Sequence, residues 1–284
     1  MGWVRRRPTW RWVVDIAGLV VLGAIFLTFD STPHLSDGYA YWSAWDGGLY
    51  DKAWLEHHAY VYSPAFAQLL WPLTHLSWPV FNALWMAGQM AVAIALVTPI
   101  GLAVLLVAPA MQFVQFTIER GNIHFFLAGA VTFAVLRWPV LWALVLHTKP
   151  TMGAALAWYV GRRDWKGLKV SLISTFAIGV LSFAIAPQLW VDWWALMADG
   201  ASRSPTGLLL PRLVLAAFIA WIGGVANQRW PVPIAAFLAA PTIWVGSSEV
   251  MFFGALFLAW QDWRDGRLFR LSRSHTAGVA SAPC

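Results

Sequence analysis

The chain has 284 residues, of which 60% are apolar, only 11% are charged and 21 are tryptophan. Soluble domains carry about a quarter charged residues, and disordered chains have few aromatic residues, so this composition excludes both classes. The single cysteine, Cys284, excludes a disulfide framework and a cysteine-based metal site. At about 20 residues for each span, the length accommodates about ten transmembrane helices, so an all-α polytopic membrane protein is predicted.

The first apolar segment, residues 12–29, follows four arginines and is not followed by a signal-peptide cleavage site. We therefore expect a retained first helix with its N-terminus in the cytoplasm. Residues 65–73 form a shorter apolar segment that contains Pro72, which is typical of an interfacial helix. Further membrane helices are expected at residues 80–97, 101–117, 123–136, 140–148, 152–160, 167–186, 213–226, 234–244 and 250–260.

Two of these segments, residues 140–148 and 152–160, are too short to cross a membrane alone. They meet at Lys149-Pro150, where the proline disfavours helical backbone in the residue before it. Half-length helices are tolerated at membrane depth only where protein or a watery cavity covers them. We expect a single integral-membrane domain over residues 1–270 and a disordered cytoplasmic tail over residues 271–284.

The distribution of charge along the chain predicts its orientation. Counting spans alternately from a cytoplasmic N-terminus places most basic residues inside and most acidic residues outside, as the positive-inside rule requires. The net charge of +6 is therefore a topology signal, and nucleic-acid binding loses its main support. Anionic membrane lipids are the natural partners of the basic loops. We expect a multi-pass protein of the plasma membrane with both termini in the cytoplasm.

The first outer loop opens with a carboxylate and several aromatic residues. Asp37 is followed closely by Tyr41 and Trp42, and aromatic faces beside an acid suit the recognition of a sugar. Asp37 is the best catalytic candidate among the acidic residues because aromatic side chains bracket it. The loop closes with Tyr60 and Tyr62, which can donate hydrogen bonds inward. The alternatives are an interfacial aromatic belt with solvated acids and simple loop closure.

Two further clusters combine a cation with polar side chains. Arg120 precedes the helix expected at residues 123–136, whose N-terminus favours an anion such as phosphate. Asn122 is either the N-cap of that helix or a ligand contact. His147 and Lys149 lie at the joint of the half-length helices, where a lysine usually faces a cavity or a partner. We expect Lys149 to bind an anionic headgroup; snorkelling to the outer interface is the alternative.

The sequence contains no recognisable metal or nucleotide motif. His57 and His58 are adjacent instead of four residues apart, and the P-loop, GxGxxG and GxSxG patterns are all missing. We therefore expect no metal site and no cofactor.

With these residues in place, the chain resembles glycosyltransferase family 87, a family of integral-membrane enzymes, from the first helix to about Trp260. The resemblance rests on the order and spacing of short motifs: Asp37 with Tyr41, Leu49-Tyr50, Tyr60-Val61-Tyr62-Ser63-Pro64, Arg120-Gly121-Asn122, Thr148-Lys149 and residues 240–244. It implies a GT-C-like bundle of about ten transmembrane helices, including the two half-length helices, with a catalytic aspartate in the first outer loop.

Members of this family transfer a sugar, typically mannose, from a polyprenyl-phosphate donor to a lipid-linked or glycan acceptor. The resemblance therefore implies an inverting, metal-independent hexosyltransferase that acts at the outer face of the membrane. Asp37 would be the general base, and Lys149 and Arg120 would hold the leaving phosphate. The side chains expected to contact the sugar or the acceptor are Tyr41, Trp42, Tyr60, Tyr62, Asn122 and His147.

Three features depart from the family's pattern. Ser63-Pro64 stands where a double proline is usual, residues 246–249 lack the histidine of some members, and the chain is short. A non-catalytic, lipid-binding relative and a membrane transporter or flippase are the alternative functions. A transporter would place its functional charges near the middle of the membrane, whereas these charges cluster at the expected outer face.

Overall fold

The computed structural model describes residues 16, 20, 37–54, 56–101, 108–203, 208–243 and 248–267, and the predicted tail lies outside this range. Of the predicted first helix, only residues 16 and 20 are described, both as helical. The described residues form helices and no β-strand. The α-helices are α2 (Asp37–Trp42), α3 (Pro64–Thr74), α4 (Trp78–Val97), α5 (Ala108–Glu119), α6 (His124–Leu136), α7 (Trp142–Thr148), α8 (Ala157–Arg162), α9 (Trp165–Ile185), α10 (Pro187–Arg203), α11 (Leu209–Val225), α12 (Pro231–Ala239) and α13 (Met251–Arg264).

Two of these helices, α4 and α9, are long and apolar enough to cross a membrane. The apolar part of α9 is only 11% buried inside the protein, and large side chains such as Ile173, Phe176 and Leu181 are exposed along it. A long helix that leaves its apolar surface uncovered is typical of contact with lipid. The other helices are shorter than a full span, so the predicted ten-span topology stays a prediction.

The two half-length helices predicted around Lys149 are confirmed. The first consists of a 3₁₀ turn, η4 (Pro139–Leu141), followed by α7, and the second consists of η5 (Pro150–Leu156) followed by α8. Lys149 lies between them with φ −136° and ψ 79°, which is outside the helical region. The break follows from Pro150, because a proline disfavours helical backbone in the residue before it.

The helix predicted at residues 65–73 is also present, as α3, and its position at a membrane interface stays a prediction. The segment expected at residues 234–244 is different, because α12 begins at Pro231 and ends at Ala239. Ala240 precedes Pro241 and has an extended backbone (φ −57°, ψ 134°), which ends the helix early.

The close packing of α8 against α11 depends on two glycines. A Cβ atom at Gly161 would collide with the carbonyl oxygen of Trp221 on α11, and one at Gly224 would collide with the carbonyl oxygen of Trp158 on α8. Small residues allow the backbones of two helices to approach this closely. The α11 helix also packs against η5 and α12, so the second half-length helix is enclosed by protein.

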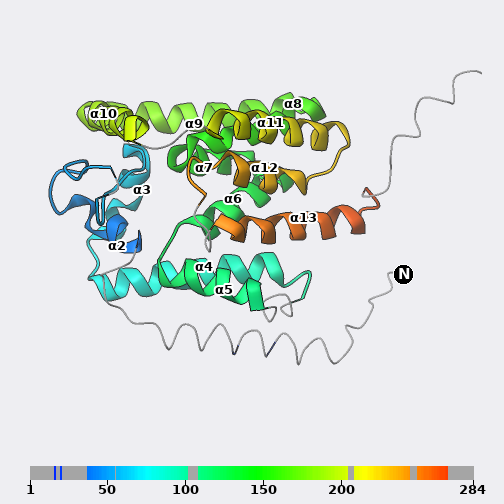
Figure 1. Ribbon diagram of the computed structural model, residues 1–284, viewed down its shortest axis with the longest axis horizontal. Helices are drawn as coiled ribbons and strands as arrows, with labels where there is room; N and C mark the ends of the chain where they lie inside the picture. Colours follow the sequence, from blue (N-terminus) through cyan, green and yellow to red (C-terminus); the bar gives the residue numbers. More distant parts are fainter. Residues whose placement is uncertain are drawn as a thin grey trace, which may run out of the picture.

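The functional candidates and the basic turns lie at opposite ends of the bundle (Figure 1). We call the end that contains α2, α3 and α10 the α2 end. We call the other end the basic end; it contains the turn between α8 and α9, the turn between α11 and α12, and the C-terminus of α13. The long helix α9 runs from one end to the other.

At the α2 end, α10 lies in a part of the chain between the segments expected at residues 167–186 and 213–226, where no helix is predicted. It is amphipathic, because Trp193 and Leu196 are buried whereas Val191 and Trp194 are exposed. The indole nitrogen of Trp193 donates a hydrogen bond to the carbonyl oxygen of Val61, at 3.2 Å. This contact ties α10 to the loop that precedes α3.

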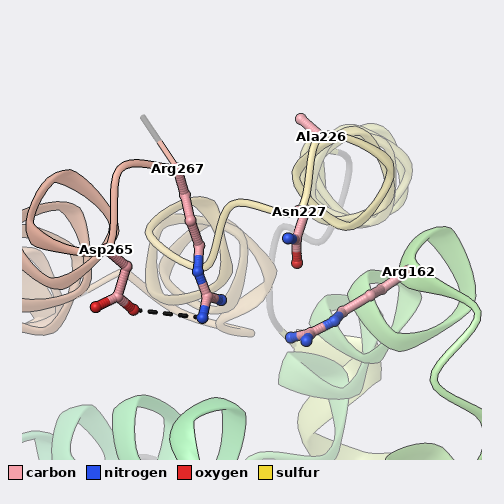
Figure 2. A pocket seen from close by; sticks show the side chains of 5 residues that line it. All are labelled: Arg162, Ala226, Asn227, Asp265 and Arg267. Atoms are coloured by element: carbon pink, nitrogen blue, oxygen red, sulfur yellow. Dashed lines mark ion pairs between the residues drawn. The ribbon is translucent and has the colours of Figure 1, made fainter. Parts of the chain in front are cut away.

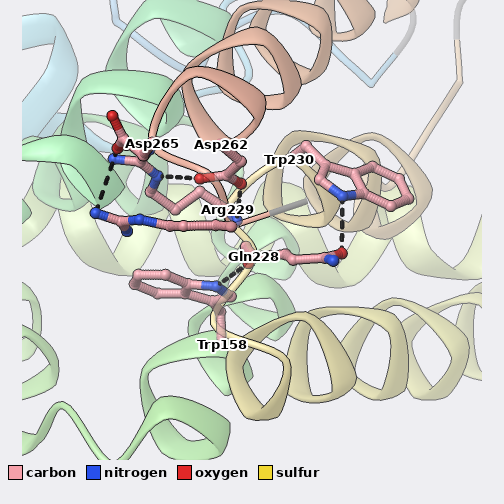
Figure 3. Close-up of polar contacts among 7 residues, drawn as sticks. Trp158, Gln228, Arg229, Trp230, Asp262 and Asp265 are labelled. Carbon is pink, nitrogen blue, oxygen red and sulfur yellow. Dashed lines mark hydrogen bonds and ion pairs between the residues drawn. The ribbon is translucent and has the colours of Figure 1, made fainter. Parts of the chain in front are cut away.

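At the basic end, a buried ion pair ties α13 to the turn between α11 and α12 (Figure 3). The guanidinium Nε of Arg229 lies 2.7 Å from Oδ1 of Asp262, and its backbone nitrogen donates to Oδ2 of the same carboxylate at 2.6 Å. A second guanidinium nitrogen lies 2.9 Å from Asp265. The adjacent Gln228 accepts hydrogen bonds from the indole nitrogens of Trp158 and Trp230. The turn is therefore held from both sides.

Candidate active site

The carboxylate of Asp37 lies at the start of α2 and is only partly exposed. The next residue, Gly38, donates its backbone N–H to the carbonyl oxygen of Arg120 at 3.3 Å, which fixes α2 against the turn between α5 and α6. Oδ2 of Asp37 accepts a hydrogen bond of 2.6 Å from the side-chain amide of Asn122. Two motifs that are 85 residues apart in the sequence therefore meet at one carboxylate.

Asn122 caps α6 and also contacts Asp37, whereas its predicted contact with a ligand stays a prediction. Its side-chain oxygen accepts the backbone N–H of His124, the first residue of α6, at 3.1 Å, so it caps the helix as expected. Its amide nitrogen is thereby turned toward Asp37. The preceding Gly121 has φ +62°, a conformation that favours glycine, and its carbonyl oxygen accepts a hydrogen bond of 2.7 Å from the indole nitrogen of Trp85. The amide that holds Asp37 is therefore itself held in place.

Lys149 points into the protein instead of snorkelling to an interface, and it is only 6% exposed. Its Nζ lies 3.0 Å from Nε2 of His124. An ammonium group can only donate, so Nε2 accepts and the imidazole proton lies on Nδ1. Within the described residues, this Nδ1 is buried and has no hydrogen-bond partner. The hydroxyl of Ser248, just before α13, lies 3.5 Å from Nε2 of the same histidine.

Asp37, Arg120 and Lys149 are near enough to interact electrostatically. Burial raises the pKa of the Asp37 carboxyl above its ordinary value of 3.8, because the charged form loses hydration. The hydrogen bond from Asn122 and the positive charges of Arg120 and Lys149 oppose this shift. The arrangement places one carboxylate beside two cations, with Asn122 and His124 linking Asp37 to Lys149 by hydrogen bonds.

Two of the predicted tyrosines lie beside this group of charges. The hydroxyls of Tyr41 and Tyr62 are 3.2 Å apart, and Tyr41 follows Asp37 by one helical turn. Both rings interact electrostatically with Asp37. Tyr41 also packs against the ring of Trp85, so the aromatic residues form one wall next to the carboxylate.

Three other predicted contact residues use their polar atoms elsewhere. The indole nitrogen of Trp42 donates to the carbonyl oxygen of Leu76 at 2.7 Å, and the hydroxyl of Tyr60 donates to the carbonyl oxygen of Ser63 at 3.2 Å. Nε2 of His147 lies 3.0 Å from the carbonyl oxygen of Thr175 on α9. These contacts tie α2 to the segment after α3, fix the end of the first loop and tie α7 to α9, so a direct role for the three side chains in binding sugar or acceptor stays a prediction.

His124 and Ser248 are the site residues that sequence reasoning missed. His124 ends the segment Glu119-Arg120-Gly121-Asn122-Ile123-His124, two residues after the predicted cap Asn122. This position is the feature of the sequence that could have identified it as a site residue. Ser248 lies in residues 246–249, which were considered only for the histidine that they lack. No spacing in the sequence predicts these contacts, because His124 and Lys149 are 25 residues apart and Ser248 and His124 are 124 residues apart.

A comparison with protein-family models matches residues 60–280 to the model described as glycosyltransferase family 87. The chain belongs to glycosyltransferase family 87. No curated protein and no solved structure matches it. The stretch that matches the glycosyltransferase model includes Asn122, His124, Lys149 and Ser248. The matched stretch begins after α2 and does not include Asp37. Asp37 contacts the matched stretch through the hydrogen bond from Asn122.

Proposed function

We propose that the protein is an inverting hexosyltransferase that moves mannose from a polyprenyl-phosphate donor to a lipid or glycan acceptor. Membership of glycosyltransferase family 87 supports the transfer of a sugar. The observation that carries the proposal is the hydrogen-bonded series from Asp37 through Asn122 and His124 to Lys149. It joins a base for the acceptor to a cation for the leaving phosphate, which are the two charges that this transfer needs.

In the proposed reaction, the Asp37 carboxylate takes the proton from the acceptor hydroxyl. The acceptor oxygen forms a bond to the anomeric carbon while the bond from that carbon to the phosphate oxygen breaks, which inverts the configuration. A general base works best when its pKa is near the working pH, and burial moves the pKa of Asp37 in that direction. Asn122 occupies Oδ2 of Asp37 and so orients Oδ1 for the acceptor.

The leaving group in this reaction is a polyprenyl monophosphate. Lys149 and Arg120 are proposed to stabilise the negative charge that develops on its oxygen. His124 is proposed as a positioning residue, because its Nε2 lies 3.0 Å from the Lys149 ammonium and both side chains are buried. Tyr41 and Tyr62 are proposed to line the sugar site next to Asp37. The proposal needs no metal ion and no cofactor.

The reaction is proposed to take place at the outer face of the plasma membrane, with the protein crossing the membrane several times. The charges at the two ends of the bundle support this orientation. The basic end carries the exposed Arg162 and Arg163 where α8 ends, which is typical of a cytoplasmic surface, whereas Asp37 lies at the other end. Helix α9 provides an apolar surface that fits the lipid between the two ends.

The proposal is tested by donor binding and sugar transfer with the full-length protein in lipid nanodiscs. Radiolabelled polyprenyl-phosphate mannose is incubated with the protein and a total lipid extract, and labelled products are separated. We expect transfer by the wild type. We also expect weaker donor binding by Lys149→Gln, with unchanged binding by the matched control Lys52→Gln, whose side chain is exposed in the first loop. Equal donor binding by both variants would contradict the assignment of Lys149 to the phosphate.

A further inference from the structure

The basic end of the bundle contains a cavity of about 250 Å³, far from Asp37. Its lining residues come from three segments: Arg162 from α8, Ala226 and Asn227 from the turn after α11, and Asp265 and Arg267 from the end of α13. We propose that this cavity binds the phosphate group of an anionic ligand. The proposal is independent of sugar transfer, because it concerns the opposite end of the protein.

The charges around the cavity leave a positive excess. The carboxylate of Asp265 is neutralised by Arg229 at 2.9 Å and by Arg267 at 3.3 Å, and Asp262 is paired with Arg229 at 2.7 Å. With Arg162 included, three guanidinium groups face two carboxylates, which leaves a charge of +1. In the part of the chain that the structure describes, Arg162 has no carboxylate within ion-pair distance. The spare guanidinium therefore suits an external anion.

The polar groups of the cavity are also arranged to converge. Figure 2 shows that the side chains of Arg162, Asn227 and Arg267 point from three different segments toward the same space. The Arg162 guanidinium carbon is positioned over the ring of Trp158, 5.1 Å from its centroid, and this cation–π contact leaves its N–H groups able to donate to a ligand. Asn227 has φ +55°, and this left-handed turn directs its amide into the cavity. Guanidinium and amide N–H groups are donors that suit phosphate oxygens.

Two sources can supply such a phosphate group. The cavity lies at the ends of helices, where the headgroups of membrane lipids would lie, and basic pockets between membrane helices bind anionic headgroups. A small soluble phosphate would make the same hydrogen bonds. The volume of about 250 Å³ is far above the roughly 10–15 Å³ that a cavity needs to hold one water molecule, so a phosphate group fits without rearrangement of the helices.

The lipid source is tested by native mass spectrometry of the full-length protein in mixed micelles of phosphatidylglycerol and phosphatidylcholine. The wild type should retain phosphatidylglycerol preferentially, and Arg162→Gln should weaken this retention about tenfold, as expected for the loss of one hydrogen bond to a charged group. Arg163→Gln is the matched control, because it removes the same charge from the next position but does not line the cavity. Asn227→Gly keeps the turn, since glycine favours positive φ, and it should also weaken retention.

The soluble source is tested by equilibrium dialysis of radiolabelled inorganic phosphate against the protein in phosphatidylcholine nanodiscs. Saturable binding that Arg162→Gln weakens and Arg163→Gln does not would support the cavity with free phosphate as its ligand. Selective retention of phosphatidylglycerol without phosphate binding would support it with a lipid as its ligand. The proposal is overturned if neither probe binds selectively, or if Arg163→Gln loses as much binding as Arg162→Gln.

Discussion

Replacing Asp37 by asparagine tests the proposed base with little change in shape. The asparagine oxygen can still accept the 2.6 Å hydrogen bond from Asn122, but the side chain cannot take a proton from the acceptor. General bases contribute about 10²–10⁴-fold to catalysis, so we expect kcat to fall by that factor. This corresponds to about 3–5 kcal/mol of transition-state stabilisation. Residual transfer is expected because Lys149 and Arg120 still stabilise the leaving phosphate.

The same variant should fold at least as well as the wild type. Burial raises the pKa of Asp37 because the folded protein disfavours its charged form, so a neutral side chain removes a destabilising term at neutral pH. The measurement combines single-turnover transfer of labelled mannose with a thermal unfolding curve in the same detergent. Asp46→Asn is the matched control, since Asp46 is exposed and lies in the same loop.

The two readouts separate loss of catalysis from loss of structure. The expected result is an Asp37→Asn protein with kcat lowered about 10²–10⁴-fold and an unfolding temperature that is not lowered, beside a fully active Asp46→Asn protein. If Asp37→Asn kept most of the wild-type kcat, Asp37 would not be the base. If both variants lost activity equally, the acidic loop would act through its net charge and the assignment of one carboxylate would be refuted.

Three further predictions concern the surroundings of the site and the bundle. Asn122→Ala removes a hydrogen bond that lowers the pKa of Asp37, so the pKa of this carboxyl should rise. Because activity needs the ionised carboxylate, the variant should lose activity at a higher pH than the wild type as the solution is acidified. A pH–rate profile that matches the wild type would contradict this role. Asp262→Asn removes the fully buried carboxylate and leaves the Arg229 guanidinium with only the partly exposed Asp265, so it should destabilise the protein by about 3 kcal/mol, measured by unfolding, whereas exchanging Arg229 and Asp262 for apolar residues should restore stability. Gly161→Ala forces α8 away from a backbone oxygen of α11 and should lower the unfolding temperature, whereas Gly47→Ala, in an open loop, should not. If the two variants unfolded at the same temperature, the helices could separate without cost.

Much of the fold follows from local properties of the sequence. Apolar runs locate α4, α6, α9, α11 and α13, since a continuous run of apolar residues is favoured in a helix that contacts lipid or core. Pro150 predicts the break between the half-length helices, because its ring restricts the residue before it. The early end of α12 and the helical state of α10 were missed. For α10, the cause is its contact with the first loop through Trp193, which depends on distant residues.

For the candidate site, the sequence by itself determined the chemical groups: an acid beside aromatic residues, a helix cap, and a lysine at a break between helices. Only the tertiary structure decided that these groups meet. The hydrogen bond from Asn122 to Asp37 joins residues 85 positions apart, and His124 approaches Lys149 only because α6 packs beside α7. Side-chain chemistry and proline geometry act over a few residues and can be read from the sequence. Contacts between helices depend on how all of their apolar faces pack together, and no local pattern specifies that packing.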